Sequence, residues 1–450
     1  MSERELLHAT ADYAAHFLER LDERPVRWDA DVGELYEGLG GPLPEEGLDP
    51  RAVLASLVDA AEPGLVGTTS GRYFGFVIGG AVPAALAADW LASAWDQNPG
   101  IYAGGPSASV VEEVARGWLA ELLGLPAHVS AAFVTGCQMA HVTALAAARH
   151  RVLAQAGWDV EADGLAGSPP IRVVVGAKRH VTLDRALRLL GIGASSLFVV
   201  PADDQGRMRI DELPDLGGMP TIVCGQAGEV NTGAFDDLGA IADAAAAGGA
   251  WFHVDGAFGL WAAASPELAH LVHGSERADS WATDCHKWLN VPYDSGVAFC
   301  ANEDAHRAAM SVTASYLVHA KDPRMRDAVD WTPEFSRRAR GFAVYAAIRS
   351  LGRSGIAQLV DHCCAHARRF AELLEEGGLT VLNDVVLNQV LVRCDPEVVT
   401  RVQADGTCWL GGTQWNGDHA MRISVSNWRT TEDDVERSAA AILAAARVSV

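Results

Sequence analysis

The chain has 450 residues, of which 49% are apolar and 21% charged, and its formal net charge is −23. A chain of this length and composition holds enough apolar residues for more than one globular lobe. The negative charge argues against nucleic acid and against an anionic membrane surface as partners. Each Ala-rich stretch is interrupted by Asp, Arg or Gly within about 20 residues, so we expect no transmembrane helix.

The N-terminus and the cysteines both favour the cytoplasm. Residues 1–7 are charged and amphipathic and lack the apolar centre of a signal peptide. The eight cysteines are scattered, apart from the adjacent Cys363 and Cys364, and they form no C-x-x-C pair. We therefore expect a reducing, cytoplasmic compartment, and neither a disulfide framework nor a metal site.

The first part of the chain is expected to be helical. Leu, Ala and Val recur at helical spacing over residues 3–24 and 50–61, on either side of a turn-rich segment at 38–49. We interpret residues 1–68 as an N-terminal helical arm rather than a separate domain. In a large enzyme such an arm usually packs on a neighbouring part of the protein or on a second subunit.

An aromatic and glycine-rich segment at 72–80 follows the arm and leads into a helix expected over 83–95. The glycines Gly79 and Gly80 either bring the backbone close to a ligand or form an ordinary tight turn. We regard Phe76 and Gly79 as candidate substrate contacts in this segment. A further amphipathic helix is expected over 110–123.

From residue 131 onward, short apolar runs alternate with helical segments. The expected strands are 133–134, 172–175, 197–200, 221–224, 251–254 and 296–300, and the helices include 138–156, 183–190 and 238–247. Runs that are apolar on both faces are typical of a mainly parallel sheet covered by helices on both sides. We therefore expect a large α/β domain over 69–345. Ligands of such sheets bind at the carboxyl ends of the strands, where the informative residues are sought.

The last part of the chain is expected to form a small α+β domain over 346–450. The expected elements are helices over 336–351 and 356–375, strands at 380–382, 387–392 and 421–425, and a closing helix over 432–446. Thr430 and Thr431 supply hydroxyl groups that can cap this last helix, and Glu432 and Asp433 complement its N-terminal dipole.

The residues after the apolar runs carry the chemistry. Lys287 lies among apolar and aromatic residues. If its side chain is buried, its amine can be reactive; the alternative is a lysine at a strand edge whose amine extends into solvent. Asp255 ends one run, and His180 follows another. Residues 135–138 open a helix, whose N–H groups and dipole make an anion site. Together these groups fit pyridoxal 5′-phosphate (PLP). The lysine can bind its aldehyde, the carboxylate its pyridinium nitrogen and the helix start its phosphate, and the imidazole can stack on its ring.

The chain also resembles the fold-type I PLP enzymes, specifically the group II amino-acid decarboxylases, which include the aromatic amino-acid and glutamate enzymes. The matching stretches are HVDGAF at 253–258, DCHKW at 284–288, FVTG at 133–136, GEVNTGAFD at 228–236 and MRISVSNW at 421–428. The HKW and HVD matches together are highly specific. The resemblance implies the aspartate aminotransferase-like fold of PLP-dependent transferases and a homodimer with its active site at the subunit interface.

The resemblance also implies a role for each matching residue. Lys287 forms the Schiff base with the cofactor, Asp255 pairs with the pyridine nitrogen, and His180 stacks on the ring and can donate a proton. The other implied cofactor contacts are Gly136, Cys137, Gln138, Asn231, Asp284 and His286. Asn231 also fits a routine Asn-Thr-Gly turn. Arg422 is a candidate for the substrate carboxylate, and a solvated strand arginine is the alternative.

Two cofactor positions depart from the family pattern. The phosphate turn commonly carries small residues, whereas this chain has the bulkier Cys137, Gln138 and Met139. Asp284 stands where the animal enzymes often have Asn, and it brings a negative charge near the phosphate unless its side chain turns away. Neither departure abolishes the expected cofactor binding.

A third departure concerns the reaction. The family's mobile loop carries a tyrosine that protonates the substrate carbon after CO2 leaves, but residues 319–330 contain no tyrosine, so Tyr316 or His319 is the candidate donor. We expect a decarboxylase that releases CO2 from the α-carbon of an L-amino acid and returns an amine. Relatives without the tyrosine release aldehyde and ammonia, so an aldehyde-forming enzyme, an aminotransferase or a lyase is the alternative. A further alternative is a catalytically inactive relative that serves as a binding protein.

Overall fold

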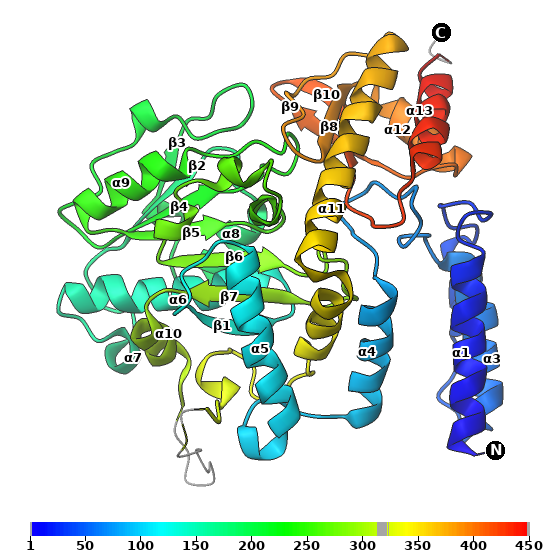
Figure 1. Cartoon of the computed structure of the whole chain (residues 1–450), viewed down its shortest axis with the longest axis horizontal. Helices are drawn as coiled ribbons and strands as arrows, with labels where there is room; N and C mark the ends of the chain where they lie inside the picture. Colours follow the sequence, from blue (N-terminus) through cyan, green and yellow to red (C-terminus); the bar gives the residue numbers. More distant parts are fainter. Residues whose placement is uncertain (1, 313–321, 323, 448–450) are drawn as a thin grey trace.

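A computed structural model describes residues 2–312, 322 and 324–447. Its core is a large lobe built on a seven-stranded sheet, with a smaller lobe built on a three-stranded sheet and a helical arm beside them (Figure 1). This architecture confirms the predicted α/β class with a mainly parallel sheet, an N-terminal arm and a small C-terminal α+β part. The boundaries at 68 and 345 remain a prediction.

The arm lies apart from both sheets in Figure 1. Its helices are α1 (Glu3–Glu19), α2 (Val32–Leu39) and α3 (Pro50–Ala61). Ser2 and Asp31 begin α1 and α2 with capping boxes, in which each side chain accepts a hydrogen bond from the backbone three residues on. The predicted helix over 3–24 ends earlier, at Glu19, and the short α2 was not predicted. None of the three helices has a buried residue within the described chain.

The large sheet has the strand order β1-β7-β6-β5-β4-β2-β3. Its strands are β1 (Ser130–Val134), β2 (Arg172–Gly176), β3 (Leu197–Val200), β4 (Thr221–Gln226), β5 (Trp251–Asp255), β6 (Ser280–Asp284) and β7 (Gly296–Cys300). All neighbours from β3 to β6 pair in parallel, whereas β7 runs antiparallel to both β6 and β1. The carboxyl ends of β1, β2, β4, β5 and β6 therefore meet at one edge of the sheet.

Helices cover both faces of this sheet. On one face lie α6 (Cys137–Gln155), α7 (Val160–Asp163), α8 (Val181–Leu189) and α10 (Glu303–Met310), and on the other α5 (Pro106–Leu122), α9 (Leu238–Gly248) and α11 (Gly341–Glu376). Val173 and Val175 pack into the core on the α6 side, and Val174 packs into the opposite core. Side chains of a strand alternate between faces, so an unbroken apolar run indicates burial on both.

The strand β3 is an exception. Phe198 and Val199 are 42% and 46% exposed, because β3 is the last strand of the sheet and only β2 pairs with it. Burial on both faces, predicted for all the apolar runs, is therefore wrong for this one.

The small lobe differs more from the sequence prediction. Its sheet has the antiparallel order β8-β10-β9, from β8 (Gln389–Arg393), β9 (Gly411–Trp415) and β10 (Asp418–Ser424), flanked by α12 (Pro396–Asp405) and α13 (Glu432–Arg447). Neither β9 nor α12 was predicted, and the predicted strand at 380–382 is only a single bridge between Val381 and Val392. The Thr431 hydroxyl accepts a hydrogen bond from the Asp434 N–H, which confirms a hydroxyl cap for α13.

Two helices link the lobes. The predicted helix over 83–95 is α4 (Pro83–Trp95). The two helices predicted over 336–351 and 356–375 are the two parts of α11, which meet at a kink at Gly352. Gly352 in α11 has a φ of 62°, a kink that glycine tolerates without a steric penalty. Within the described residues, no helix combines the length and the apolar character that a membrane span requires.

Candidate active site

Side chains from five segments meet at the carboxyl edge of the large sheet. Asp255 and Asp284 are the last residues of β5 and β6, and His180 caps the N-terminus of α8 after β2. Cys137 begins α6 directly after β1, and Lys287 follows β6 in a turn. The sequence predicted that Asp255, His180 and the start of α6 would lie at this edge, but it did not predict β6, which places Asp284 there.

Lys287 forms an ion pair with Asp284. Its Nζ lies 2.9 Å from Asp284 Oδ2, and the Lys287 side chain is 19% exposed. Burial alone would lower the pKa of Lys287, but the charge of the Asp284 carboxylate and its hydrogen bond raise the pKa above its usual value. The lysine is therefore held as a paired ammonium group.

Asp284 does not turn away from the start of α6. Its Oδ1 accepts a hydrogen bond of 2.6 Å from the Cys137 N–H and lies 3.5 Å from His286 Nε2. A Cβ at Gly136 would lie 3.0 Å from the His286 ring and 3.3 Å from this same oxygen, so glycine permits the close approach. The positive N-terminus of α6 and the Lys287 ammonium together compensate the buried carboxylate.

Replacing Asp284 with Asn is expected to lower the pKa of Lys287, because burial then acts without the compensating charge of the carboxylate. Competitive labelling with acetic anhydride, read at each lysine by mass spectrometry over neutral to alkaline pH, measures this pKa. The variant should label at lower pH than the wild type. Asp294→Asn is the matched control, because Asp294 is paired with Arg340 instead. An unchanged profile in Asp284→Asn would contradict the assignment.

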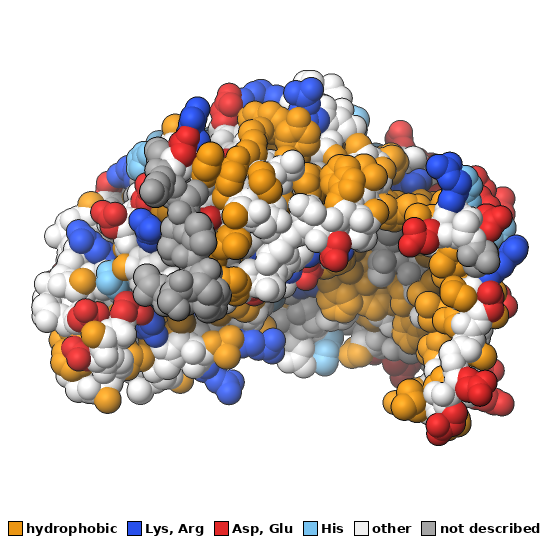
Figure 2. Space-filling view, turned by 90° about the horizontal axis from the view of Figure 1, so that it is seen from below, with side chains coloured by type: hydrophobic (Ala, Val, Ile, Leu, Met, Phe, Trp, Pro, Cys, Tyr) orange, Lys and Arg blue, Asp and Glu red, His pale blue; other side chains and the backbone are white. Residues whose placement is uncertain are grey.

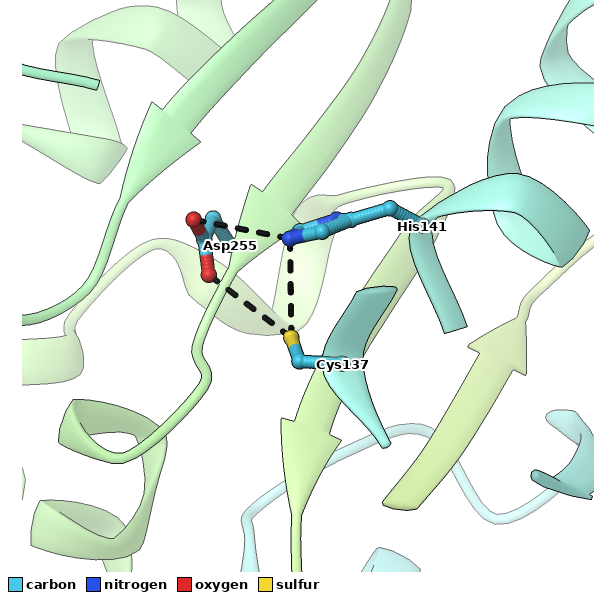
Figure 3. Close-up of side chains that lie close together, drawn as sticks. All are labelled: Cys137, His141 and Asp255. Carbon is cyan, nitrogen blue, oxygen red and sulfur yellow. Dashed lines mark hydrogen bonds and ion pairs between the residues drawn. The ribbon is translucent and has the colours of Figure 1, made fainter. Parts of the chain in front are cut away.

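Asp255 is a buried, ionised carboxylate. Its Oδ2 lies 3.5 Å from His141 Nε2, and its Oδ1 accepts a hydrogen bond from the Ala257 N–H at 3.2 Å. Burial acts to raise the pKa of Asp255, but His141, His180 and Lys287 more than reverse this and hold it well below its usual value. Figure 3 shows Asp255 of β5 facing His141 and Cys137 of α6.

His180 is held by the first turn of α8. Its Nδ1 lies 2.8 Å from Thr182 Oγ1 and accepts a hydrogen bond from the Thr182 N–H. Burial lowers the pKa of His180, although Asp255 acts to raise it, so the neutral ring is favoured. Because Nδ1 accepts, the proton of the neutral ring is on Nε2.

The start of α6 offers free donors. Among the described residues, the N–H groups of Gly136 and Gln138 have no hydrogen-bond partner. The Gln138 side chain donates to the Thr182 carbonyl, which turns it toward α8. His286 accepts a hydrogen bond from the Ser295 N–H on Nδ1, and burial lowers its pKa.

The other predicted site residues have mixed surroundings. Asn231 donates to Glu229 and accepts from Thr413, so its side chain is engaged within a turn. The Arg422 side chain on β10 has no hydrogen-bond partner among the described residues, and burial lowers its pKa although Glu229 acts to raise it. Tyr316 and His319 lie outside the described residues.

The 72–80 segment lies directly against the lysine turn. A Cβ at Gly79 would come within 1.8 Å of the Lys287 carbonyl oxygen, so only glycine permits this contact. Phe76 has a φ of 53° and is exposed, with its ring 5.2 Å from that of Trp409. The segment thus contacts the lysine turn at Gly79, and the exposed Phe76 ring packs beside Trp409.

Sequence reasoning missed two residues beside the site, His141 and His253. Both are fully buried, and their rings are joined by a hydrogen bond of 2.9 Å. Their spacing could have identified them, because residues four apart share a helix face and residues two apart share a strand face. His141 is four residues after Cys137, and His253 is two before Asp255.

The chain is similar to known proteins over most of its length. The family profile described as "Pyridoxal-dependent decarboxylase conserved domain" matches residues 37–393. The chain is 26% identical to an aromatic-L-amino-acid decarboxylase of Bacillus atrophaeus, over 96% of this chain and 93% of the relative. It is 25% identical to a 4-hydroxyphenylacetaldehyde synthase of Rhodiola rosea, over 94% of this chain and 91% of the relative.

The fold is similar to that of solved structures. A crystal structure of Oryza sativa TDC with PLP and tryptamine superposes with a TM-score of 0.92 and 23% sequence identity. The match covers 99% of this chain and 97% of the other. At this identity the likeness establishes the architecture.

Proposed function

The chain belongs to the pyridoxal-dependent decarboxylase family, and on that premise we propose that it uses PLP to release CO2 from the α-carbon of an L-amino acid. One observation carries the proposal: a buried lysine and a buried, ionised carboxylate meet beside a helix start at the carboxyl edge of the sheet. The idle-protein alternative has no support from this arrangement, because the amine and the carboxylate are both present.

The residues present fit the cofactor. The unpartnered N–H groups of Gly136 and Gln138 are suited to its phosphate, Lys287 to its aldehyde and Asp255 to its ring nitrogen. When bound, PLP supplies an aldehyde that captures amines and a ring that accepts electrons from the α-carbon. We also propose His286 and Cys137 as phosphate neighbours and Asn231 as a neighbour of the cofactor hydroxyl.

Asp284 regulates the proton on Lys287 in this proposal. A lysine must lose its proton to act as a nucleophile, and the Asp284 carboxylate, 2.9 Å from Nζ, opposes that loss by raising the pKa of Lys287. The same carboxylate lies on the Cys137 N–H, beside the free donors of α6. We therefore propose that Asp284 stabilises the helix start and the ammonium group when the phosphate is absent.

His180 and Arg422 are proposed to act on the substrate. The neutral His180 ring carries its proton on Nε2, because Nδ1 accepts from Thr182, and that N–H is available as a donor. The charges of Arg422 and His180 influence each other, and Arg422 lacks a hydrogen-bond partner among the described side chains. A substrate carboxylate would supply that partner. Phe76 and Gly79 are proposed to bound the substrate from the 72–80 segment.

A second function, release of an aldehyde and ammonia, is favoured by a specific observation. Residues 319–330 contain no tyrosine, and one relative that matches 94% of the chain is an aldehyde synthase. Under the first function, Tyr316 or His319 is the proposed donor of the proton that replaces CO2.

Product analysis tests both functions. The PLP-loaded protein is incubated with pooled L-amino acids, and CO2, amine, ammonia and peroxide are measured. We expect CO2 and amine in equal amounts. Ammonia, peroxide and aldehyde without amine would establish the second function. The matched control is protein reduced with borohydride, in which the cofactor is fixed and turnover should stop. If no CO2 forms from any amino acid, both functions are contradicted.

We also propose a homodimer with the active site at the subunit interface. The arm exposes large apolar side chains, namely Leu7, Tyr13, Tyr36, Leu43, Val53 and Leu57. In Figure 2, hydrophobic side chains line the projecting part at the right, next to a hollow in the surface. A contiguous apolar surface of this kind marks an interaction site, and a second copy of the chain would cover it.

A further inference from the structure

A series of buried hydrogen bonds leads into the interior from His141, whose ring lies 3.5 Å from Asp255. His141 Nδ1 lies 2.9 Å from His253 Nε2, and His253 Nδ1 lies 2.8 Å from Ser280 Oγ. Trp251 Nε1 donates to the same oxygen at 2.8 Å. The four side chains are at most 3% exposed. Buried polar groups need partners, so the direction of each hydrogen bond in this series matters.

Figure 3 shows the end of this hydrogen-bond series that lies next to Asp255. His141 Nε2 lies 3.5 Å from Asp255 Oδ2 and 3.5 Å from Cys137 Sγ. Burial, together with the Asp284 and Asp255 carboxylates, raises the pKa of Cys137 well above its usual value, so its thiol stays protonated. Only the Asp255 carboxylate therefore presents a negatively charged acceptor to His141 Nε2.

The direction of these hydrogen bonds is set at Ser280 and Trp251, the end farthest from Asp255. An indole N–H can only donate, so Ser280 Oγ accepts from Trp251 and has one proton to give. Its remaining contact is His253 Nδ1. If Ser280 donates there, His253 carries its proton on Nε2 and donates to His141 Nδ1. His141 then carries its proton on Nε2 and directs it at the Asp255 carboxylate. In this arrangement every buried group has a partner.

The opposite direction leaves groups unsatisfied. If His253 donates from Nδ1 to Ser280, the hydroxyl proton has no acceptor among the described residues. His141 must then donate from Nδ1, and its Nε2 either presents a lone pair to a carboxylate or carries a second proton. The first sets the lone pair against a carboxylate oxygen at 3.5 Å and leaves the weak Cys137 S–H as the donor to Nε2 among the described residues. The second puts a charge on a fully buried ring. Burial and the neighbouring His141 lower the pKa of His253 to about 3, so that ring stays neutral.

We propose that His141 is a positioning residue: the relay from Ser280 through His253 directs its N–H at Asp255 Oδ2 and so fixes the orientation of the carboxylate that would pair with the cofactor ring nitrogen. The proposal rests on the proposed function, since it concerns the carboxylate that would pair with that nitrogen. His253 stays neutral, and the relay orients the carboxylate through one directed N–H of His141. The ionisable groups around it are Cys137, His180, Cys224, Asp284 and Lys287.

The first test uses the cofactor-free protein. With 15N-labelled histidine, NMR distinguishes the ring nitrogen that carries the proton. We expect Nε2–H and an unprotonated Nδ1 in both His141 and His253, unchanged across neutral pH, with each signal assigned from its loss in His141→Gln and His253→Gln. A proton on His253 Nδ1, or a doubly protonated His141, would overturn the relay. This result is independent of whether PLP binds.

The second test uses PLP labelled with 15N in the ring. His141→Leu should weaken PLP binding by about tenfold or more and move the ring-nitrogen signal toward the unprotonated form. His141→Gln should restore both, because its amide donates to Asp255 and accepts from His253. His150→Leu is the matched control, since His150 lies on the same helix and faces Glu161.

The proposal can still be tested if the His141→Leu variant does not fold. If His141→Leu does not fold, Ser280→Ala carries the same test, because it removes the hydroxyl that sets the direction of the relay. It should shift the ring-nitrogen signal in the same sense. A wild-type ring-nitrogen signal in both variants would overturn the positioning role. If the wild type fails to bind PLP while the histidine protons are as expected, the proposed function falls and the relay stands.

Discussion

Replacing Lys287 with Ala is expected to abolish the visible absorbance band of lysine-bound PLP and to lower turnover by about a thousandfold or more. The lysine would supply both the amine that holds the cofactor and a group that moves protons at the substrate. Its pKa is governed by burial and Asp284, so no exposed lysine can take its place. Absorbance titration with PLP and product release under saturating substrate measure the two effects.

The small number of lysines makes the site of cofactor attachment easy to identify. There are three lysines, at positions 178, 287 and 321. Borohydride reduction of the loaded protein should therefore place the cofactor mass on one lysine-containing peptide, that of Lys287. Lys178→Ala is the matched control, because Lys178 lies over the Trp415 ring and, among the described residues, has no carboxylate partner like that of Lys287. A Lys287→Ala variant that still gains the band and the fixed mass would refute the PLP site.

The strand ends could be predicted because of local chemistry. Leu197–Val200 and Gly296–Cys300 are strands at the expected residues, since short apolar runs bounded by Gly or polar residues have few other favourable conformations. The same logic placed Asp255 after its strand and the anion-binding turn after β1. By contrast, β9 contains two glycines, a threonine and a glutamine, so its pairing with β10 rather than its own composition makes it a strand.

The contacts of Asp284 could not be predicted in the same way. Its charge was expected to be unfavourable beside a phosphate unless the side chain turned away, but it lies between the α6 N-terminus and Lys287. This pairing joins residues 147 positions apart in the chain. The favourable field depends on how α6 packs against β6, which is a property of the folded chain.

The second large effect is expected at Asp255. Asp255→Asn keeps the size of the side chain and removes its charge, so the ring nitrogen would lose the group that holds its proton. Turnover should fall by roughly a hundred- to a thousandfold, while PLP still attaches to Lys287. The measurements are steady-state turnover and borohydride fixation on the same preparation.

Asp255→Glu and Asp236→Asn complete the Asp255 experiment. Glu keeps the negative charge but displaces it by one methylene, so its turnover should lie between those of the wild type and Asp255→Asn. Asp236 is another buried carboxylate of this sheet region, but it accepts hydrogen bonds from the Met208 and Gln226 N–H groups. Its replacement by Asn should lower stability and leave the 15N signal of the ring nitrogen unchanged. Wild-type turnover in Asp255→Asn would show that the charge is dispensable. Because His141 would then have no carboxylate to orient, the same result would remove the reason for the relay.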